Sequence, residues 1–461
     1  LLKINPFKFP KGIHILEHID RLVEIFNVCW PMYAAMPAVL KDALLQAYRV
    51  CGWNLVNSKN MYSDDLYPTF QDLLAELVDV IKNSAYSEEV KSNYMGSLVT
   101  RVKSLTNGLN GQIFAAKEID NKILFDKKTI IDLSRIGSME TKSLIMGILI
   151  MRLSEYRMTS NYEMNQPLKH VTILEEAHNI LKKVSTEQNS EGANVAGKSV
   201  EMISNAIAEM RTYGEGFIIV DQSPSAVDIS AIRNTNTKII MRLPDEQDRR
   251  MAGKSAGLKD EQLDEIAKLP KGVAVVYQND WVEPVLCSIQ KFRGEEGRYQ
   301  YVFEGTEENA TALFKTKILE LLLKYRVNDP IDNDIDEVIE LLNDADIAVK
   351  NKLVLRKLLN TCKKTEDLPM WKDDNFEELS GVVTEILDGA LKTKSAIECS
   401  QDYDELTNHL MKYIAEETED LPRSFALAAS QCLMKNESVD NKESRDIYAA
   451  WITHLRNKSV L

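Results

Sequence analysis

Hydrophobic residues over the first hundred positions recur at helical spacing. Between residues 15 and 50 they follow each other at steps of three and four, as Leu16, Ile19 and Leu22 do, which places them on one face of a helix. Residues 68–106 repeat this spacing. The pattern therefore predicts a largely helical N-terminal segment.

The pattern changes after residue 128, where short and nearly continuous apolar runs alternate with helical ones. Four runs predict single strands: Thr129–Leu133, Val171–Leu174, Gly216–Val220 and Thr237–Met241. Two more flank a polar turn and predict a hairpin: Gly272–Tyr277 and Val285–Ile289. Helical patterns lie between the runs: Thr141–Tyr156, Ser199–Thr212 and Asp260–Lys268. Apolar strands that alternate with helices are typical of an α/β fold, with a largely parallel sheet covered by helices on both faces.

Beyond the hairpin only helical patterns remain, including Ala310–Tyr325 and Ile335–Leu342. We therefore predict three domains. Residues 1–128 form the start of an α/β core with an inserted helical segment, residues 129–300 form the main part of that core, and residues 301–461 form an all-helical C-terminal domain.

Composition excludes several classes of protein. Hydrophobic residues make up 44% and charged residues 27% of the 461 positions, which excludes wholesale disorder. The longest apolar stretch, Leu144–Leu153, contains Arg152 and is shorter than the ~20 residues of a membrane span. The six cysteines include no C-x-x-C pair, which is typical of reduced thiols. We expect a cytoplasmic protein without a membrane segment.

Charge is distributed unevenly along the chain. The first 300 residues carry 36 Lys and Arg against 38 Asp and Glu, whereas residues 301–461 carry 20 against 32, a net charge of −12. This balance disfavours a broad basic surface for nucleic acid. The charge balance is still compatible with nucleic-acid binding by a few basic residues that line a confined channel.

The most informative motif is HVTILEEAH, residues 170–178. Its apolar run ends in Glu175 and Glu176, which places two carboxylates at the carboxyl end of a buried strand, where open α/β sheets bind ligands. In P-loop NTPases one carboxylate helps to hold Mg²⁺ and another residue orients the attacking water. A strand that ends in two solvated glutamates is the alternative, and this motif alone does not decide between them.

Three further motifs follow in order. Arg211 precedes a turn at Gly214, and the next predicted strand ends at Gln222, near the carboxylate strand. A Gln at that position suits a sensor of the γ-phosphate, and a lone Arg suits a charge placed across a subunit boundary. Asn236 and Arg242 then flank the strand that begins at Thr237.

With these four motifs, residues 129–292 resemble the C-terminal half of the HerA–FtsK superfamily of ring-forming P-loop ATPases, and the HerA-like branch is the most similar. Residues 4–60 also resemble a segment of that family. Glu175 departs from the family pattern, which usually has Asp there, although the longer carboxylate can still bind Mg²⁺.

The resemblance implies a RecA-like core that uses ATP and Mg²⁺, and it implies a role for each motif residue. Glu175 helps to hold Mg²⁺, Glu176 activates water, Gln222 senses the γ-phosphate, and Arg211 completes the site of a neighbouring subunit. Asn236 and Arg242 are weaker candidates for contacts to the nucleotide at the subunit boundary.

The same resemblance implies a homohexamer that translocates or unwinds double-stranded DNA, together with a nuclease or another effector. The alternative is a ring scaffold that assembles and activates an effector, such as a nuclease or a sirtuin-type NAD hydrolase, in bacterial antiviral defence. The acidic C-terminal region would then bind that effector.

Two other motifs match known sites, and we interpret both as coincidental. Gly192–Ser199 has the pattern G-x-x-x-x-G-K-S, but no buried strand precedes it, as a phosphate-binding loop requires. We interpret it as a loop that caps the helix from Ser199, and we expect the phosphate loop upstream of Leu1. His14, Glu17 and His18 match the H-x-x-E-H of inverted zinc peptidases, but Gly12 directly before them places His14 at a fraying helix start.

Overall fold

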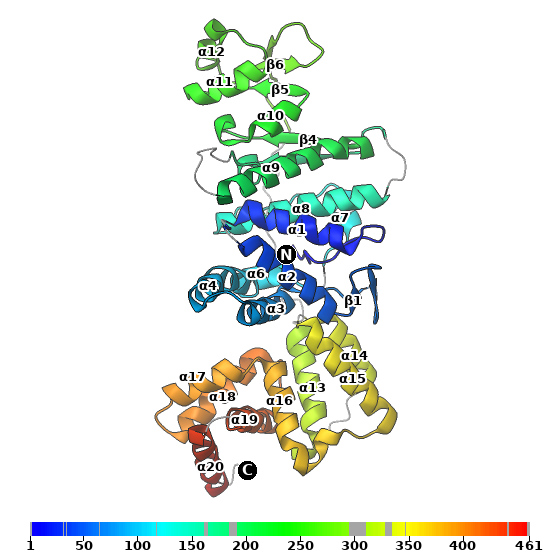
Figure 1. Ribbon diagram of the computed structural model, residues 1–461, viewed down its shortest axis with the longest axis vertical. Coiled ribbons are helices and arrows are strands. Elements are labelled where there is room, and N and C mark those ends of the chain that lie inside the picture. The colour runs from blue at the N-terminus through cyan, green and yellow to red at the C-terminus, as the bar shows by residue number, and fades with distance from the viewer. Residues whose placement is uncertain are drawn as a thin grey trace. The chain divides into compact units, whose positions relative to one another are not determined.

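A computed structural model describes most of the chain as two compact units. The described residues are 2–30, 32–33, 35–63, 65–116, 118–160, 165–183, 191–294, 310–327, 334–345, 347–439 and 442–458. The first unit comprises Leu1–Asp64, Leu73–Phe114 and Glu118–Gln300, and the second comprises Asp65–Asp72, Ala115–Lys117 and Tyr301–Leu461 (Figure 1). The division into three domains stays a prediction.

Twelve α-helices are described up to residue 266. They are α1 (Ile15–Cys29), α2 (Met36–Val50), α3 (Phe70–Asn83), α4 (Glu88–Tyr94), α5 (Thr100–Leu105), α6 (Gly108–Ile113), α7 (Asn121–Phe125), α8 (Met139–Ser160), α9 (Glu191–Glu209), α10 (Ile229–Asn234), α11 (Glu246–Ser255) and α12 (Asp260–Ile266). The helical segment expected over the first hundred residues is confirmed. Helix α9 begins eight residues before the predicted start at Ser199.

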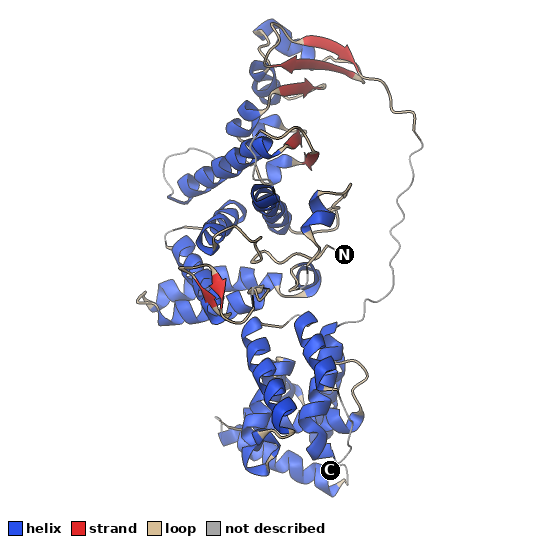
Figure 2. Cartoon of the chain, turned by 90° about the vertical axis from the view of Figure 1, so that its right-hand side faces the viewer, coloured by secondary structure: helices blue, strands red, loops and turns tan. Residues whose placement is uncertain are grey.

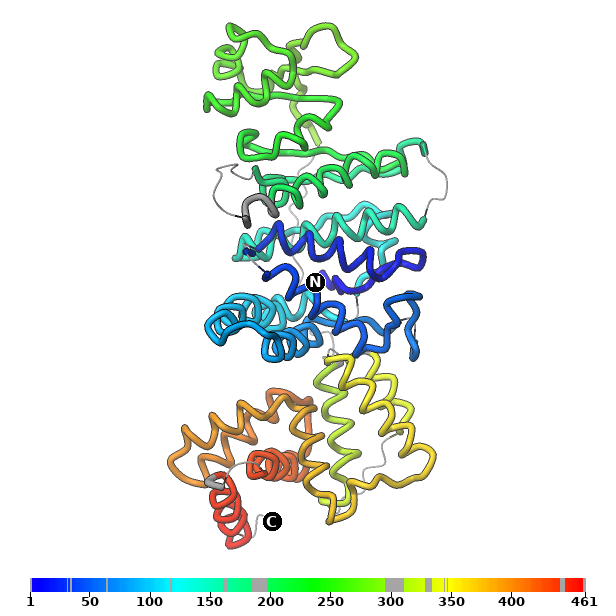
Figure 3. The backbone as a smooth tube through the Cα atoms, viewed as in Figure 1, coloured from blue at the N-terminus to red at the C-terminus, as the bar shows by residue number. Residues whose placement is uncertain are grey.

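Helices α1, α8 and α9 lie side by side in the first unit (Figure 3). A buried polar pair joins α1 to α8, because His18 Nδ1 lies 3.0 Å from both carboxylate oxygens of Glu155. The other ring nitrogen of His18 lies 3.1 Å from the carbonyl oxygen of Pro6, and Arg21 approaches Glu155 to 3.3 Å. The buried side chains of His18 and Glu155 therefore both have polar partners, as buried polar groups require.

The strands form three small sheets (Figure 2). They are β1 (Trp53–Asn54), β2 (Lys59–Asn60), β3 (His170–Glu175), β4 (Glu215–Val220), β5 (Thr237–Ile240), β6 (Val273–Gln278) and β7 (Val285–Ser288). Strands β3 and β4 are parallel, whereas β5, β6 and β7 form an antiparallel sheet. The predicted strands from Val171 onward and the hairpin are confirmed, but the described residues do not form one largely parallel sheet.

The strand predicted over Thr129–Leu133 is wrong. Residues 129–133 belong to no strand, and the side chain of Ile130 is 95% exposed. A β-branched run favours extended backbone, but it becomes a strand only when a neighbouring strand accepts and donates its hydrogen bonds. Among the residues that the structure describes, no strand pairs with this segment.

One face of the β3–β4 pair is open among the described residues. Ile173 of β3 pairs with Ile218 of β4, so both side chains point to the same side of the sheet, where they are 60% and 50% exposed. Val171 and Val220 on that face are exposed as well. Parallel strands are normally covered on both faces, so this apolar face lacks a covering element in the described part of the chain.

The opposite face of the β3–β4 pair is tied to α8 through the buried carboxylate of Glu215. Arg157 Nε of α8 donates to Glu215 over 2.8 Å, and His170 Nδ1 lies 2.7 Å from the same carboxylate. Arg157 also donates to Asp126. Burial alone would raise the pKa of Asp126, but hydrogen bonds from Arg157 and Tyr156 outweigh it and hold that pKa below its ordinary value.

In the second unit every described element from residue 310 onward is helical. The helices are α13 (Ala310–Val327), α14 (Ile335–Asp344), α15 (Val349–Thr365), α16 (Phe376–Leu387), α17 (Ala390–Cys399), α18 (Tyr403–Glu417), α19 (Arg423–Glu437) and α20 (Lys442–Asn457). They share an apolar core in which Leu322, Phe425 and Trp451 are fully buried. Among the described residues no helix has both the length and the apolarity needed to cross a bilayer.

Candidate active site

The carboxyl ends of β3 and β4 bring the central motif residues together. Since the two strands are parallel and Glu175 pairs with Val220, the residues that follow each strand leave the sheet at the same edge. Glu176 follows β3, and Asp221 and Gln222 follow β4. The edge therefore carries three carboxylates and one amide within a few residues of the last strand pair.

Glu176 and Gln222 are in direct contact. Gln222 Nε2 donates to Glu176 Oε1 over 3.0 Å. The backbone of Glu176 is left-handed, with φ 52° and ψ 48°, a conformation that costs a residue with a side chain about 1–3 kcal/mol and is concentrated at functional sites. The main-chain oxygen of Glu176 accepts two hydrogen bonds of 2.9 Å from Asn179, which close the short turn after the strand.

Asp221 is the site residue that sequence reasoning missed. Its Oδ2 accepts a hydrogen bond of 2.8 Å from the backbone N–H of His178 and lies 2.9 Å from His178 Nδ1. Its Oδ1 accepts from the backbone N–H of Ser223. A carboxylate directly after an apolar strand, beside a strand that ends in two glutamates, is the sequence signal that could have indicated it.

Glu175 is suited to bind a cation. Its side chain is exposed, and among the described residues no hydrogen bond or ion pair engages it. Mg²⁺ prefers oxygen ligands and, in nucleotide sites, is held by one or two protein oxygens together with the phosphates. No described group of three or more acidic, His or Cys side chains could hold a metal by itself, so Glu175 fits a cation shared with a nucleotide.

Arg211 lies at the other end of the same strands. It belongs to a 3₁₀ turn, Met210–Tyr213, that ends at Gly214, whose φ of 85° favours glycine. The Arg211 side chain is exposed and has no partner among the described residues. Strand β4 is six residues long, about 20 Å at ~3.3 Å per residue, and it separates Arg211 from Gln222. Arg211 therefore cannot serve the Glu176 carboxylate of its own chain.

Asn236 and Arg242 are not brought to this edge. They flank β5, which belongs to the antiparallel sheet, and both side chains are exposed. The backbone oxygen of Asn236 accepts a hydrogen bond from the N–H of Asn279. The structure thus groups Glu175, Glu176 and Gln222 and leaves Arg211, Asn236 and Arg242 elsewhere on the first unit.

The sequence Gly192–Ser199 lies entirely within helix α9. A phosphate-binding loop presents its backbone N–H groups to the phosphates, whereas from the fifth residue of a helix onward, which includes Gly197, Lys198 and Ser199, the N–H groups are bonded to carbonyls of the preceding turn. Ser199 is fully buried and donates to Glu24 of α1. This geometry supports the interpretation that the match is coincidental.

Replacing Lys198 with Ala should leave ATP hydrolysis by the complete protein largely unchanged, because this exposed side chain is on a helix and not in a phosphate loop. A genuine P-loop lysine contacts the β- and γ-phosphates, and its loss removes activity. Steady-state ATPase rates of the two proteins check this. A loss comparable to that of a P-loop mutant would show that Lys198 binds phosphate.

The two histidines of the H-x-x-E-H pattern have different environments. His14 caps α1, where its Nδ1 accepts from the backbone N–H of Leu16, and its Nε2 lies 3.2 Å from the oxygen of Val56. His18 is buried against Glu155. Both nitrogens of each ring have protein partners, so this pattern serves helix capping and packing.

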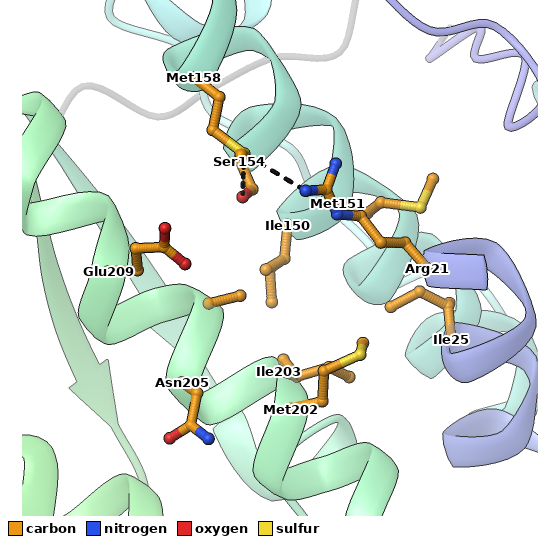
Figure 4. A pocket seen from close by; sticks show the side chains of 11 residues that line it. Arg21, Ile25, Ile150, Met151, Ser154, Met158, Met202, Ile203, Asn205 and Glu209 are labelled. Atoms are coloured by element: carbon orange, nitrogen blue, oxygen red, sulfur yellow. Dashed lines mark hydrogen bonds between the residues drawn. The ribbon is translucent and has the colours of Figure 1, made fainter. Parts of the chain in front are cut away.

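A cleft of about 200 Å³ lies between α1, α8 and α9 (Figure 4). Its lining is mainly apolar and includes Met151, Met158 and Met202. Its cation, Arg21, donates to Met158 Sδ and is paired with Glu17 and Glu155. A triphosphate needs several free cations or N–H donors, so this cleft does not have the features of a nucleotide site.

Comparison with known proteins identifies several relatives that are named HerA helicase. No protein-family model matches the chain. It is similar to the DNA double-strand break repair helicase HerA of Sulfurisphaera tokodaii, with 23% identity over 301 residues, which cover 62% of this chain and 58% of that protein. It is similar to the HerA helicase of Pyrococcus furiosus, with 24% identity over 327 residues, 63% of this chain and 59% of that protein. These relatives confirm the resemblance to the HerA branch.

The chain spans somewhat more than half the length of the curated relatives it matches. A solved structure of VirB4 of Thermoanaerobacter pseudethanolicus aligns over 63% of this chain and 74% of that one, with 16% identity and a TM-score of 0.48, a value too low to support a conclusion.

Proposed function

We propose that this HerA-like chain forms the catalytic part of a ring ATPase that hydrolyses ATP to translocate along or unwind double-stranded DNA. The observation that carries the proposal is the hydrogen bond from Gln222 to Glu176 at the carboxyl edge of two parallel strands, the edge at which open α/β sheets bind ligands. The relatives, which are named as DNA repair helicases, support DNA as the substrate that is moved.

The chemistry assigns separate tasks to the two glutamates. Mg²⁺, when it is bound with ATP, neutralises the charge that develops on the phosphates, and the unpartnered Glu175 carboxylate is the residue that would hold it. Glu176 orients and deprotonates the attacking water. The Glu176 Oε1 atom already accepts from Gln222, so Oε2 is the oxygen available to the water.

A RecA-like core requires more strands than the described residues provide. The open apolar face over Ile173 and Ile218 supports the proposal that a further strand and helix cover the β3–β4 pair. A strand followed by a phosphate loop and a helix has the required apolar surface. In this proposal that segment, and with it the ATP phosphate site, lies outside the residues that the structure describes.

We also propose assembly as a homohexamer, and the position of Arg211 supports a site that neighbouring subunits share. An exposed cation about 20 Å of strand away from Glu176 serves a nucleotide only if that nucleotide belongs to a neighbouring subunit. Asn236 and Arg242 are proposed for the same boundary because they are exposed. A cytoplasmic location is proposed from the six free cysteines.

The alternative is a ring scaffold that assembles and activates an effector, either a nuclease or a sirtuin-type NAD hydrolase, in antiviral defence. The observation that favours it is the second unit, which has its own apolar core and a strongly acidic composition. Such a surface would be repelled by duplex DNA, which carries a charge every ~1.7 Å, and it suits a protein partner.

Stimulation of ATPase activity by DNA tests the proposal. We expect the complete protein to hydrolyse ATP faster when double-stranded DNA is added, and to displace a labelled strand or a roadblock protein from the duplex. Hydrolysis that is insensitive to DNA, together with an effector that copurifies and becomes active when ATP is added, would instead establish the ring scaffold.

A further inference from the structure

Glu176 keeps an unfavourable backbone conformation, and the contacts around it show what maintains that conformation. A left-handed backbone in a residue with a side chain persists only where neighbouring groups hold it. The carbonyl of Glu176 is bonded to Asn179, and its carboxylate is bonded to Gln222. These bonds fix the two ends of the residue, but they do not by themselves attach the turn after Glu176 to strand β4.

Asp221 provides that attachment. A single carboxylate oxygen, Oδ2, accepts from both the backbone N–H of His178 at 2.8 Å and its ring Nδ1 at 2.9 Å. The Asp221 side chain is only 6% exposed. Hydrogen bonds to a charged acceptor that is shielded from water are stronger than neutral or solvated ones, so this pair holds the turn rigidly against the end of β4.

His178 does not form a hydrogen bond with the carboxylate of Glu176, the proposed base. Its Nδ1 lies 3.6 Å from Glu176 Oε2, which is longer than a hydrogen bond, and only 2.9 Å from Asp221 Oδ2, a carboxylate oxygen that accepts hydrogen bonds. Oε2 of Glu176 therefore stays available to water. His178 and Asp221 act on the placement of the carboxylate and not on the proton that it receives.

We propose that Asp221 and His178 form a positioning pair that holds Glu176 in the orientation required to activate water during ATP hydrolysis. This inference rests on the proposed function, and it adds two residues to the machinery that the motif residues describe. A base that is displaced by about 1 Å can lose ~10²-fold in rate without any loss of substrate binding.

The test compares His178→Ala and His178→Asn in the complete protein. Asn keeps a donor at the position of Nδ1, so it preserves the bond to Asp221, whereas Ala removes it. We expect His178→Ala to lower kcat by about 10- to 100-fold, with little change in KM for ATP or in the affinity for a non-hydrolysable ATP analogue. His178→Asn should recover most of the activity. His409→Ala, at an exposed histidine of the second unit, is the matched control and should have no effect.

A double variant separates positioning from general support of the fold. Because residues that act as a unit are not additive, Glu176→Gln with His178→Ala should hydrolyse ATP no more slowly than Glu176→Gln alone. A further loss in the double variant, or reduced ATP affinity and thermal stability in His178→Ala without rescue by Asn, would overturn the positioning role.

The proposed function and this inference fail in distinguishable ways. If the complete protein shows no ATP hydrolysis that DNA stimulates, the proposed function is overturned. If Glu176→Gln leaves kcat unchanged, Glu176 is not the base and the positioning pair is overturned, while the ATPase assignment stands. If Glu176→Gln abolishes hydrolysis while His178→Ala and Asp221→Ala retain the full rate, the ATPase assignment stands and the positioning pair is overturned.

Discussion

Replacing Glu176 with Gln should reduce the rate of ATP hydrolysis by about 10²- to 10⁴-fold, the contribution typical of a general base. The amide has nearly the same shape, and its oxygen can still accept from Gln222 as the carboxylate does. It cannot take a proton from water. Bound ATP should therefore accumulate on a ring that stays assembled, which filter binding of labelled ATP and size-exclusion chromatography measure.

The control for this variant is Glu201→Gln, at an exposed glutamate on α9 that should not affect hydrolysis. If Glu176→Gln hydrolyses ATP at more than about a tenth of the normal rate, then the water is activated by another group, since a missing base costs at least ~10²-fold. Loss of ATP binding would mean that Glu176 contributes to the nucleotide pocket and not to the chemical step.

Replacing Arg211 with Ala should lower hydrolysis by about 10³- to 10⁵-fold, the range for an arginine that stabilises the transition-state charge of phosphoryl transfer. Nucleotide binding should be largely kept, because the charge that Arg211 is proposed to stabilise develops in the transition state and not in the bound ground state. Single-turnover rates and equilibrium binding of an ATP analogue separate the two effects. Arg233→Ala, at another exposed arginine, is the matched control.

Mixing the two inactive variants tests whether Arg211 acts across a subunit boundary. In a mixed ring some interfaces pair an intact Glu176 from the Arg211→Ala subunit with an intact Arg211 from the Glu176→Gln subunit. These interfaces should hydrolyse ATP, so the mixture should recover activity that neither variant has alone. A mixture that stays inactive while heteromeric rings form would show that Arg211 acts within its own chain.

The hydrophobic pattern by itself determined most of the local structure. Continuous apolar runs gave the positions of β3, β4 and the β6–β7 hairpin, and helical spacing gave α1, α2 and α8. Whether a short segment forms a helix or a strand depends on the spacing of its apolar residues, and this spacing can be read from the segment itself. The position of Glu175 and Glu176 at a strand end, and that of Gln222 at the next strand end, could therefore be predicted without a structure.

The same reasoning failed where distant partners decide the outcome. Thr129–Leu133 has the composition of a strand, but none of the described strands pairs with it to complete the ladder. The start of α9 was placed too late because Gly192 and Gly197 suggested a loop, whereas the helix begins at Glu191. Whether β5 joins the parallel pair or an antiparallel sheet is equally a matter of long-range pairing.

In the candidate active site, too, some features follow from the local sequence and others depend on long-range contacts. The sequence alone determined which residues carry the carboxylates, the amide and the arginine, because these follow from residue type and from position relative to a strand end. Only the tertiary structure decided that Glu176 is left-handed, that Asp221 holds His178, and that Arg211 lies at the far end of β4. The reason is physical: hydrogen bonds between residues more than forty positions apart depend on the register of two strands, and no local pattern contains that register.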